Sequence, residues 1–261
     1  MQIREVKCKT ALSISTLPGL EYSLNPYRGC QHNCVYCYVP NVLRIKRSKW
    51  GSFVDVKKNI PTILSKELRK KKSGVVAIST VTDPYQSLEK KYNLTKYCLK
   101  QLLIYDLPIC IQTKSKLVTR DLDIISKFSD AEVMFSIATL NDDERKFLEP
   151  YSSSIQERLN ALKRCSEIGI KTSIFFGPVY PTITPEDLPK IVDIFMENGA
   201  TEIMIDKFNL KPGVKESVEK TMRSNPIFLE KFSKYQINYK LQKEKLLEIG
   251  KKRKMKIVDA F

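Results

Sequence analysis

Six short apolar runs alternate with amphipathic stretches along this chain, and this alternation constrains the fold more than any other feature. The runs cover 21–25, 75–80, 108–113, 132–138, 171–176 and 202–208. The stretches between them have helical spacing and lie near 60–72, 88–105, 122–128, 155–168 and 185–198. Near-continuously apolar strands that alternate with helices are typical of a parallel sheet covered by helices, so the pattern predicts an α/β protein.

The number of strand–helix units predicts an incomplete barrel. A full eight-fold barrel takes about 250 residues, whereas this chain of 261 residues has six units, between 21 and 210. We therefore expect a partial (β/α)6 TIM-type barrel over 21–210, after an N-terminal extension over 1–20. For the remainder, 211–261, we expect a basic C-terminal helical extension, with one long helix from Ser224 and a short strand at 256–258.

Composition narrows the class of protein. Hydrophobic residues make up 42% and charged residues 28%, which suits a globular domain with a buried core and excludes a disordered chain. No apolar run approaches the roughly 18 residues of a membrane helix, and the first five residues have no apolar segment of a secretory signal. We therefore expect a cytoplasmic protein that does not enter a membrane.

The net charge of +16 is concentrated in two blocks. Residues 41–72 carry 11 basic and 2 acidic side chains, and 234–256 carry 9 and 2, while the rest of the chain is neutral. Such blocks predict surfaces for a polyanion such as a nucleic acid. The alternative is solvated lysines at helix ends. Four aromatic residues in these blocks could stack on bases or pack in the core: Trp50, Phe53, Tyr235 and Tyr239.

Three of the seven cysteines form a C-x3-C-x2-C motif, Cys30, Cys34 and Cys37, just after the first predicted strand. Three thiolates can hold a [4Fe-4S] cluster and leave the fourth iron open to a ligand. Zinc is the alternative, and it would need His32 or a distant cysteine as a fourth ligand. The scattered cysteines are predicted to be small buried side chains: Cys8, Cys98, Cys110 and Cys165.

This motif, with Tyr36 before its third cysteine, resembles that of the radical S-adenosylmethionine (SAM) superfamily. Three segments look like the spore photoproduct lyase-like branch: NPYRGCQHNCVYCY at 25–38, STVTDPYQ at 79–86 and TKSKLVTRD at 113–121. The resemblance runs from about 20 to 180. It implies a barrel of the radical SAM type in which the three cysteines hold the cluster and SAM chelates its open iron. Reductive cleavage of SAM would then give a radical that abstracts hydrogen from a substrate.

The resemblance also implies the residues that contact SAM. Tyr36 would lie along the adenine, and Thr82 or Asp83 would meet the amino group. Lys114 would bind the carboxylate, for which a charged pairing is apt, and Ser136 would contact the ribose. The segment that ends at Val179 would line the adenine pocket. Core packing for Tyr36, a turn at Asp83 and a surface lysine at Lys114 are the alternatives.

Two features limit the resemblance. Spore photoproduct lyase uses a cysteine after its second strand as a hydrogen donor, whereas 79–84 contains none here, and Cys110 is a conceivable substitute. Glu149-Pro150 and Glu157-Arg158 are similar to the branch as well, although an ion pair or a helix cap would explain them equally. The catalytic hydrogen donor is therefore unknown.

The sequence predicts a radical SAM enzyme that acts on a nucleic acid through 41–72 and 234–256, with an electron donor such as ferredoxin or flavodoxin. One alternative is radical SAM modification of a protein or small metabolite. Another is an iron–sulfur or zinc module that binds nucleic acid without catalysis.

Replacing any one of Cys30, Cys34 and Cys37 by alanine should abolish cluster-dependent cleavage of SAM, because each thiolate holds a different iron. Iron and sulfide analysis of the triple alanine variant checks the assignment. Four irons per chain in that variant would show that the scattered cysteines are the ligands.

Overall fold

The computed structural model describes residues 1–70 and 73–260. An eight-stranded sheet forms its centre, with the strand order β11-β10-β9-β8-β7-β6-β3-β2. Neighbours from β3 to β11 are parallel, whereas β2 runs antiparallel to β3. The strands are β2 (Leu12–Ile14), β3 (Tyr22–Leu24), β6 (Val76–Ile78), β7 (Ile109–Thr113), β8 (Ala131–Ser136), β9 (Lys171–Phe176), β10 (Glu202–Ile205) and β11 (Lys256–Asp259).

All six predicted runs are strands of this sheet, and the predicted partial barrel is confirmed. The strand predicted at 256–258 is β11, which pairs in parallel with β10 from Glu202↔Lys256 to Ile205↔Asp259. It adds a seventh parallel strand beyond the predicted six. The two edges of the sheet, β2 and β11, are not neighbours in the strand order, so the barrel is open.

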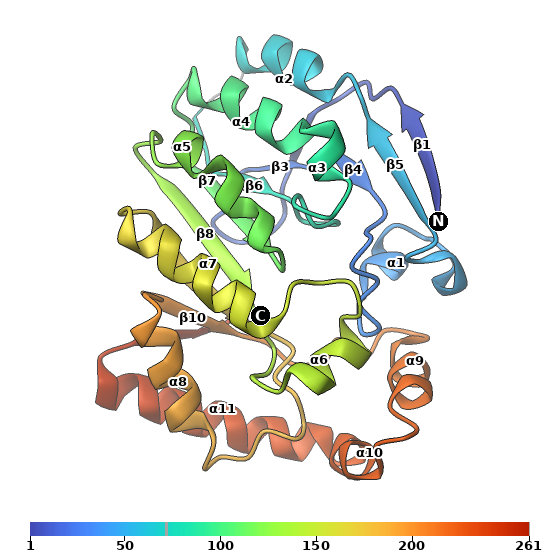
Figure 1. The fold of residues 1–261 in the computed structure, drawn as a ribbon, viewed down its shortest axis with the longest axis vertical. Helices are drawn as coiled ribbons and strands as arrows, with labels where there is room; N and C mark the ends of the chain where they lie inside the picture. The colour runs from blue at the N-terminus through green and yellow to red at the C-terminus, as the bar shows by residue number, and fades with distance from the viewer. Residues whose placement is uncertain (71–72, 261) are drawn as a thin grey trace.

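Helices connect the strands and pack around the sheet (Figure 1). Two 3₁₀ helices also occur, η1 (Arg47–Lys49) and η2 (Lys116–Asp121). The α-helices are α1 (Val39–Val42), α2 (Ile60–Leu68), α3 (Glu89–Tyr92), α4 (Leu94–Leu103), α5 (Leu122–Ile125), α6 (Asp142–Leu148), α7 (Ile155–Glu167), α8 (Leu188–Glu197), α9 (Val214–Thr221), α10 (Pro226–Ser233) and α11 (Tyr235–Arg253).

A second, three-stranded sheet lies beside the first and was not predicted. Its order is β1-β5-β4, with β1 (Gln2–Val6), β5 (Phe53–Lys57) and β4 (Tyr27–Arg28). The N-terminal extension expected over 1–20 therefore supplies an edge strand to each sheet. Charged residues interrupt β1 and β5, which hides their strand character from a search for apolar runs.

Four predicted helices are wrong in extent. The helix expected over 122–128 ends at Ile125, and the one expected over 60–72 ends at Leu68, with 71–72 outside the described residues. The helix expected over 88–105 breaks at Asn93, which takes the left-handed conformation at φ 53° and separates α3 from α4. The helix expected over 185–198 begins at Leu188 instead, because Asp187 accepts hydrogen bonds from both the backbone and the hydroxyl of Thr184 in a turn.

The single long helix expected from Ser224 is also wrong, because the chain from there forms two helices, α10 and α11. The chain changes direction at Lys234, so that Phe232 of α10 and Tyr235 of α11 both pack on Phe208, with ring centroids 5.2 and 5.0 Å away. Aromatic packing thus decides where the helix breaks. Among the described residues, no helix combines the length and apolar character that crossing a membrane requires.

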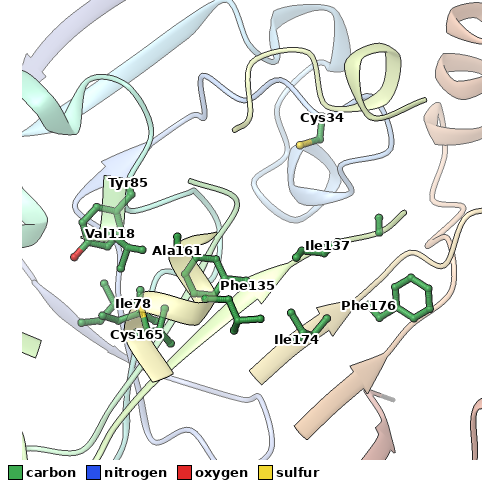
Figure 2. Close-up of a cluster of buried hydrophobic side chains, with 14 of the residues drawn as sticks. Cys34, Ile78, Tyr85, Val118, Phe135, Ile137, Ala161, Cys165, Ile174 and Phe176 are labelled. Atoms are coloured by element: carbon green, nitrogen blue, oxygen red, sulfur yellow. The ribbon is translucent and has the colours of Figure 1, made fainter. Parts of the chain in front are cut away.

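The core lies between the strands and the helices that cover them. Figure 2 shows Phe135 and Ile137 beside Ile174 and Phe176, with Cys165 of α7 nearby. Cys34 lies at the edge of this cluster on a separate loop (Figure 2). The core therefore reaches the loop of the cysteine motif.

The main helices of the two basic blocks, α2 and α11, lie far apart. The loop of the cysteine motif follows β4, at the carboxyl ends of the strands, whereas α2 and α11 lead into the amino ends of β6 and β11. The basic residues that follow α2 and end α11, such as Lys70 and Lys251, therefore lie toward the amino ends of the strands, away from the cysteine loop. Figure 1 places α2 and α11 at opposite ends of the long axis. Lys71 and Lys72 of the first block lie outside the described residues.

The aromatic residues of the two blocks are buried, which confirms core packing over base stacking. Their exposed fractions are 7% for Trp50, 7% for Phe53, 2% for Tyr235 and 7% for Tyr239. The exposed basic residues of 41–49 remain beside the cysteine loop.

Candidate active site

The three cysteines of the motif lie on one loop that begins directly after β4. All three thiols are free, with Cys30 and Cys34 buried and Cys37 partly buried. Gly29 opens the loop at φ 91°, and a β-carbon there would overlap the carbonyl oxygen of Phe53 in β5. Glycine at this position lets the small sheet support the loop from outside.

The thiols are close enough to influence one another. Burial raises the pKa of Cys30 to about 12, and the charges of Asp83 and the nearby Cys37 contribute to this value. Burial also raises the pKa of Cys34, to which both other thiols contribute, and of Cys37. Thiols in such a setting ionise when a metal takes them as ligands.

Donors and cations surround these sulfur atoms. Backbone N–H groups of His32 and Asp83 are directed at Cys30, and the N–H of Val39 is directed at Cys37, each lowering the pKa of the thiol it meets. The positive charges of Lys114 and Arg47 also favour the thiolate of Cys37. The surroundings therefore suit an anionic thiolate cluster.

The donor set fits an iron–sulfur cluster better than zinc. The Nδ1 atom of His32 lies 3.3 Å from Oδ2 of Asp83, so the imidazole faces a carboxylate. Within the described residues, no three histidine, cysteine, aspartate or glutamate side chains converge as ligands of a single ion. A cube that takes each thiolate to a different iron separates its ligands more widely than one ion does.

Asp83 ties the cysteine loop to the end of β7. Its Oδ1 accepts hydrogen bonds from Thr113 Oγ1 and the backbone N–H of Tyr85, both at 2.8 Å, and its Oδ2 accepts from the N–H of Lys114 at 2.8 Å. Burial alone would raise the pKa of Asp83, but the charge of His32 and these N–H groups lower it to about 2. Both oxygens thus have partners in the chain. A contact between Asp83 and SAM stays a prediction.

Thr82 belongs to the same anchor. Its Oγ1 donates to the carbonyl oxygen of Gly29 at 2.6 Å and accepts from Nε2 of Gln86 at 3.0 Å. Its predicted contact with the amino group of SAM also stays a prediction. The structure assigns Thr82 one role already, which is to hold the start of the cysteine loop.

Lys114 presents a charged amine at the carboxyl end of β7. Its Nζ lies 5.9 Å from the centre of the Tyr36 ring. Burial would lower the pKa of Lys114, but the charges of Cys34 and Glu149 raise it above the usual lysine value, so the amine stays protonated. In the described part of the chain, Nζ has no hydrogen bond or ion pair. It is therefore available to an anionic ligand.

Tyr36 is fixed by a buried ion pair that sequence reasoning left open. Its hydroxyl donates to Oε1 of Glu149, and Arg158 donates to Oε2 of the same carboxylate. The side chains of Glu149 and Arg158 are both 0% exposed. Arg158 also donates to the carbonyl oxygen of Ser136 at 2.7 Å. The ion pair thus joins the cysteine loop to the end of β8.

The remaining predicted contacts lie at the same end of the barrel. Ser136 is 2% exposed, and its Oγ accepts from Nε2 of Gln112 at 3.2 Å. Val179 is fully buried, and its N–H donates to the carbonyl oxygen of Asp206 at 3.0 Å. The Tyr36 ring meets Phe208 edge to face at 5.8 Å. The contacts of Ser136, Val179 and Tyr36 with SAM stay predictions.

Cys110 lies deeper in the barrel than the other predicted residues. It pairs with Ala77 and Glu132 in the register of β6, β7 and β8, four residues before Lys114 along β7. At about 3.3 Å per residue, that separates it from the strand end by roughly 13 Å. This placement does not favour Cys110 as a hydrogen donor next to the cysteine loop.

Comparison with known proteins agrees with this geometry. The family model described as "Radical SAM superfamily" matches residues 24–195. The chain is 36% identical over 184 residues to an uncharacterized protein, MJ0683, of Methanocaldococcus jannaschii, covering 70% of each chain. It is 27% identical over 165 residues to a radical SAM Nalpha-GlyT isomerase of Pseudomonas phage M6, covering 62% of this chain and 34% of that protein.

Two solved structures of spore photoproduct lyase variants share the fold. One has a TM-score of 0.70 at 15% identity and covers 99% of this chain and 81% of its own. The other, with bound AdoMet and dinucleoside spore photoproduct, has a TM-score of 0.62 at 18% identity. The match covers 85% of this chain and 66% of that protein. At these identities the likeness concerns the fold.

The substitution Arg158→Met should lower the free energy of unfolding by about 3–5 kcal/mol, because it leaves the Glu149 carboxylate buried without its cation. Chemical denaturation measures the loss. Lys116→Met, which removes the exposed ion pair with Glu157, should cost far less. Adding Glu149→Gln to Arg158→Met should recover part of the stability. Equal losses of stability in Arg158→Met and Lys116→Met would contradict the stabilising role of the buried pair of Arg158 and Glu149.

Proposed function

This chain belongs to the radical SAM superfamily, and on that premise we propose that it holds a [4Fe-4S] cluster through Cys30, Cys34 and Cys37 and binds SAM beside it. When bound, these cofactors supply the reductive cleavage of SAM and the radical that abstracts hydrogen from a substrate. The observation that carries the proposal is the half-buried amine of Lys114, which lies 5.9 Å from the centre of the Tyr36 ring and has no hydrogen bond or ion pair in the described part of the chain.

The side chains of this site bind the cofactors, orient them and exclude water. Lys114 neutralises the carboxylate of SAM, since a charge-assisted contact is strong where water is scarce. Glu149 and Arg158 fix Tyr36 and with it the third cysteine, so the loop needs little rearrangement on loading. Asp83 holds the backbone of Lys114 in register with the loop.

A nucleic acid is the substrate class that the charges favour. The chain carries +16, and Arg44, Lys46 and Lys49 are exposed directly beside the cysteine loop. A spore photoproduct lyase variant of this fold holds a dinucleoside spore photoproduct, so the fold accommodates nucleotides. Modification of a protein or metabolite is the competing proposal. The electron would come from a small carrier of the ferredoxin or flavodoxin kind.

Lys114→Met should weaken the binding of SAM by about 1.5–3 kcal/mol, or roughly 10- to 150-fold, because it removes a charged hydrogen bond. Calorimetric titration of the cluster-loaded protein measures the change. The control is Lys116→Met, which removes an exposed lysine two residues along the chain. If both variants bind SAM like the parent, Lys114 has only a structural role.

Binding of single-stranded DNA or RNA should weaken steeply as salt rises, because each phosphate contact releases a counterion. The double charge reversal Lys46→Glu with Lys49→Glu should weaken it further and leave SAM cleavage without substrate intact. Lys70→Glu with Lys251→Glu changes the charge equally at the other end of the barrel and should have less effect.

Failure to bind DNA or RNA at low salt would exclude the nucleic-acid substrate and favour a protein or metabolite. Equal weakening by the two double variants would show that binding follows net charge rather than this surface. Formation of 5′-deoxyadenosine, followed with each candidate substrate, identifies the one that couples to SAM cleavage.

A further inference from the structure

The only tryptophan of the chain covers the cysteine loop from outside. Trp50 follows η1 and is 7% exposed. It belongs to a small hydrophobic cluster, separate from the main core, whose other buried members are Cys30 and Val39. Cys37 also packs against this cluster. The indole therefore packs in the same small cluster as two of the three cysteines.

The indole N–H of Trp50 is buried and has no hydrogen-bond partner among the described residues. A buried tryptophan usually places this group on an acceptor, and leaving it unpaired costs roughly 1–3 kcal/mol. Such a group in a folded protein calls for an explanation, of which an ion or cofactor beside it is one. The neighbouring thiols make a sulfur acceptor the simplest candidate.

Arg47 shows the same feature on the same segment. Its guanidinium donates to the carbonyl oxygens of Cys37 at 2.7 Å and Val35 at 3.3 Å, while its buried Nε has no partner in the described chain. Gly51, on the other side of Trp50, lies so close to Asn33 that a β-carbon would overlap that side chain. The segment 47–51 is thus closely fitted to the cysteine loop.

We propose that the indole N–H of Trp50 donates a hydrogen bond to a sulfur atom of the iron–sulfur cluster and thereby sets its reduction potential. This inference rests on the proposed function, because it requires a cluster at the three cysteines. The reduced cluster carries one more negative charge than the oxidised cluster, so a donor stabilises the reduced form more and raises the potential. Trp50 would adjust the potential of the cluster and takes no part in bond making.

Tryptophan fluorescence tests the position of Trp50 without any substitution, because no other tryptophan contributes. Anaerobic reconstitution with iron and sulfide should quench most of the emission excited selectively from tryptophan, since the cluster absorbs nearby. The control is the variant with Cys30, Cys34 and Cys37 replaced by serine, whose emission should not change. Unquenched emission in parent protein that has gained four irons would overturn the proposal.

A redox titration tests the hydrogen bond itself. Trp50→Phe keeps an aromatic ring in the hydrophobic cluster and removes the N–H donor. The iron–sulfur cluster should therefore assemble with a lower reduction potential. A roughly tenfold shift of the one-electron equilibrium corresponds to about 59 mV. Leu43→Ala is the matched control, because Leu43 packs against the same cluster without a side-chain donor.

The sign of the shift separates the two effects. Looser packing of the hydrophobic cluster would admit water, which stabilises the more highly charged reduced iron–sulfur cluster and raises its potential. The loss of a donor lowers the potential instead. An unchanged or higher potential in Trp50→Phe would overturn the proposal, as would an equal fall in Leu43→Ala. A parent protein that forms no cluster would overturn the proposed function, and this inference with it.

Discussion

Two buried carboxylates hold the cysteine loop against the sheet, and the rest of the site depends on them. Asp83 connects the loop to β7 through Thr113 and Lys114, and Glu149 connects it to β8 through Arg158. Apolar packing is not directional, so it cannot by itself orient a loop that must present three thiols. Hydrogen bonds to fixed strand ends supply that direction.

The same carboxylates explain why the amine of Lys114 has no ion pair among the described residues. Glu149 is matched by Arg158, and Asp83 by N–H groups and His32, so both negative charges are already compensated. Lys114 lies within their influence but pairs with neither. A protonated amine at such a place favours an incoming anion, and its cost of burial falls when the anion arrives. This charge balance supports the proposal that Lys114 binds a carboxylate.

The sequence predicts the strands well because each is a compact apolar run, and it predicts the thiols because their spacing is local. It does not predict the partnership of Glu149 with Tyr36, since the two residues are 113 positions apart and their identities fit other roles. The sequence does not predict the small sheet for a similar reason, because β1 pairs with β5 across about 50 residues and polar residues interrupt both strands. The helix break at Lys234 depends on the packing of Phe232 and Tyr235 on Phe208, which no local pattern carries. The break at Asn93 has a local cause, because asparagine tolerates the left-handed conformation.

The first basic block shows how a run of charge divides in three dimensions. Arg47 turns inward to the carbonyl of Cys37, whereas Lys46 and Lys49 on either side of it are exposed. The block also touches the C-terminal extension, because Nδ2 of Asn41 donates to the carbonyl oxygen of Pro212 at 3.1 Å. Residues 39–49 and the segment before α9 therefore meet beside the cysteine loop. The exposed charges of Lys46 and Lys49 lie beside the cysteine loop, which supports the proposal that these side chains, rather than the larger number on α2 and α11, meet the substrate.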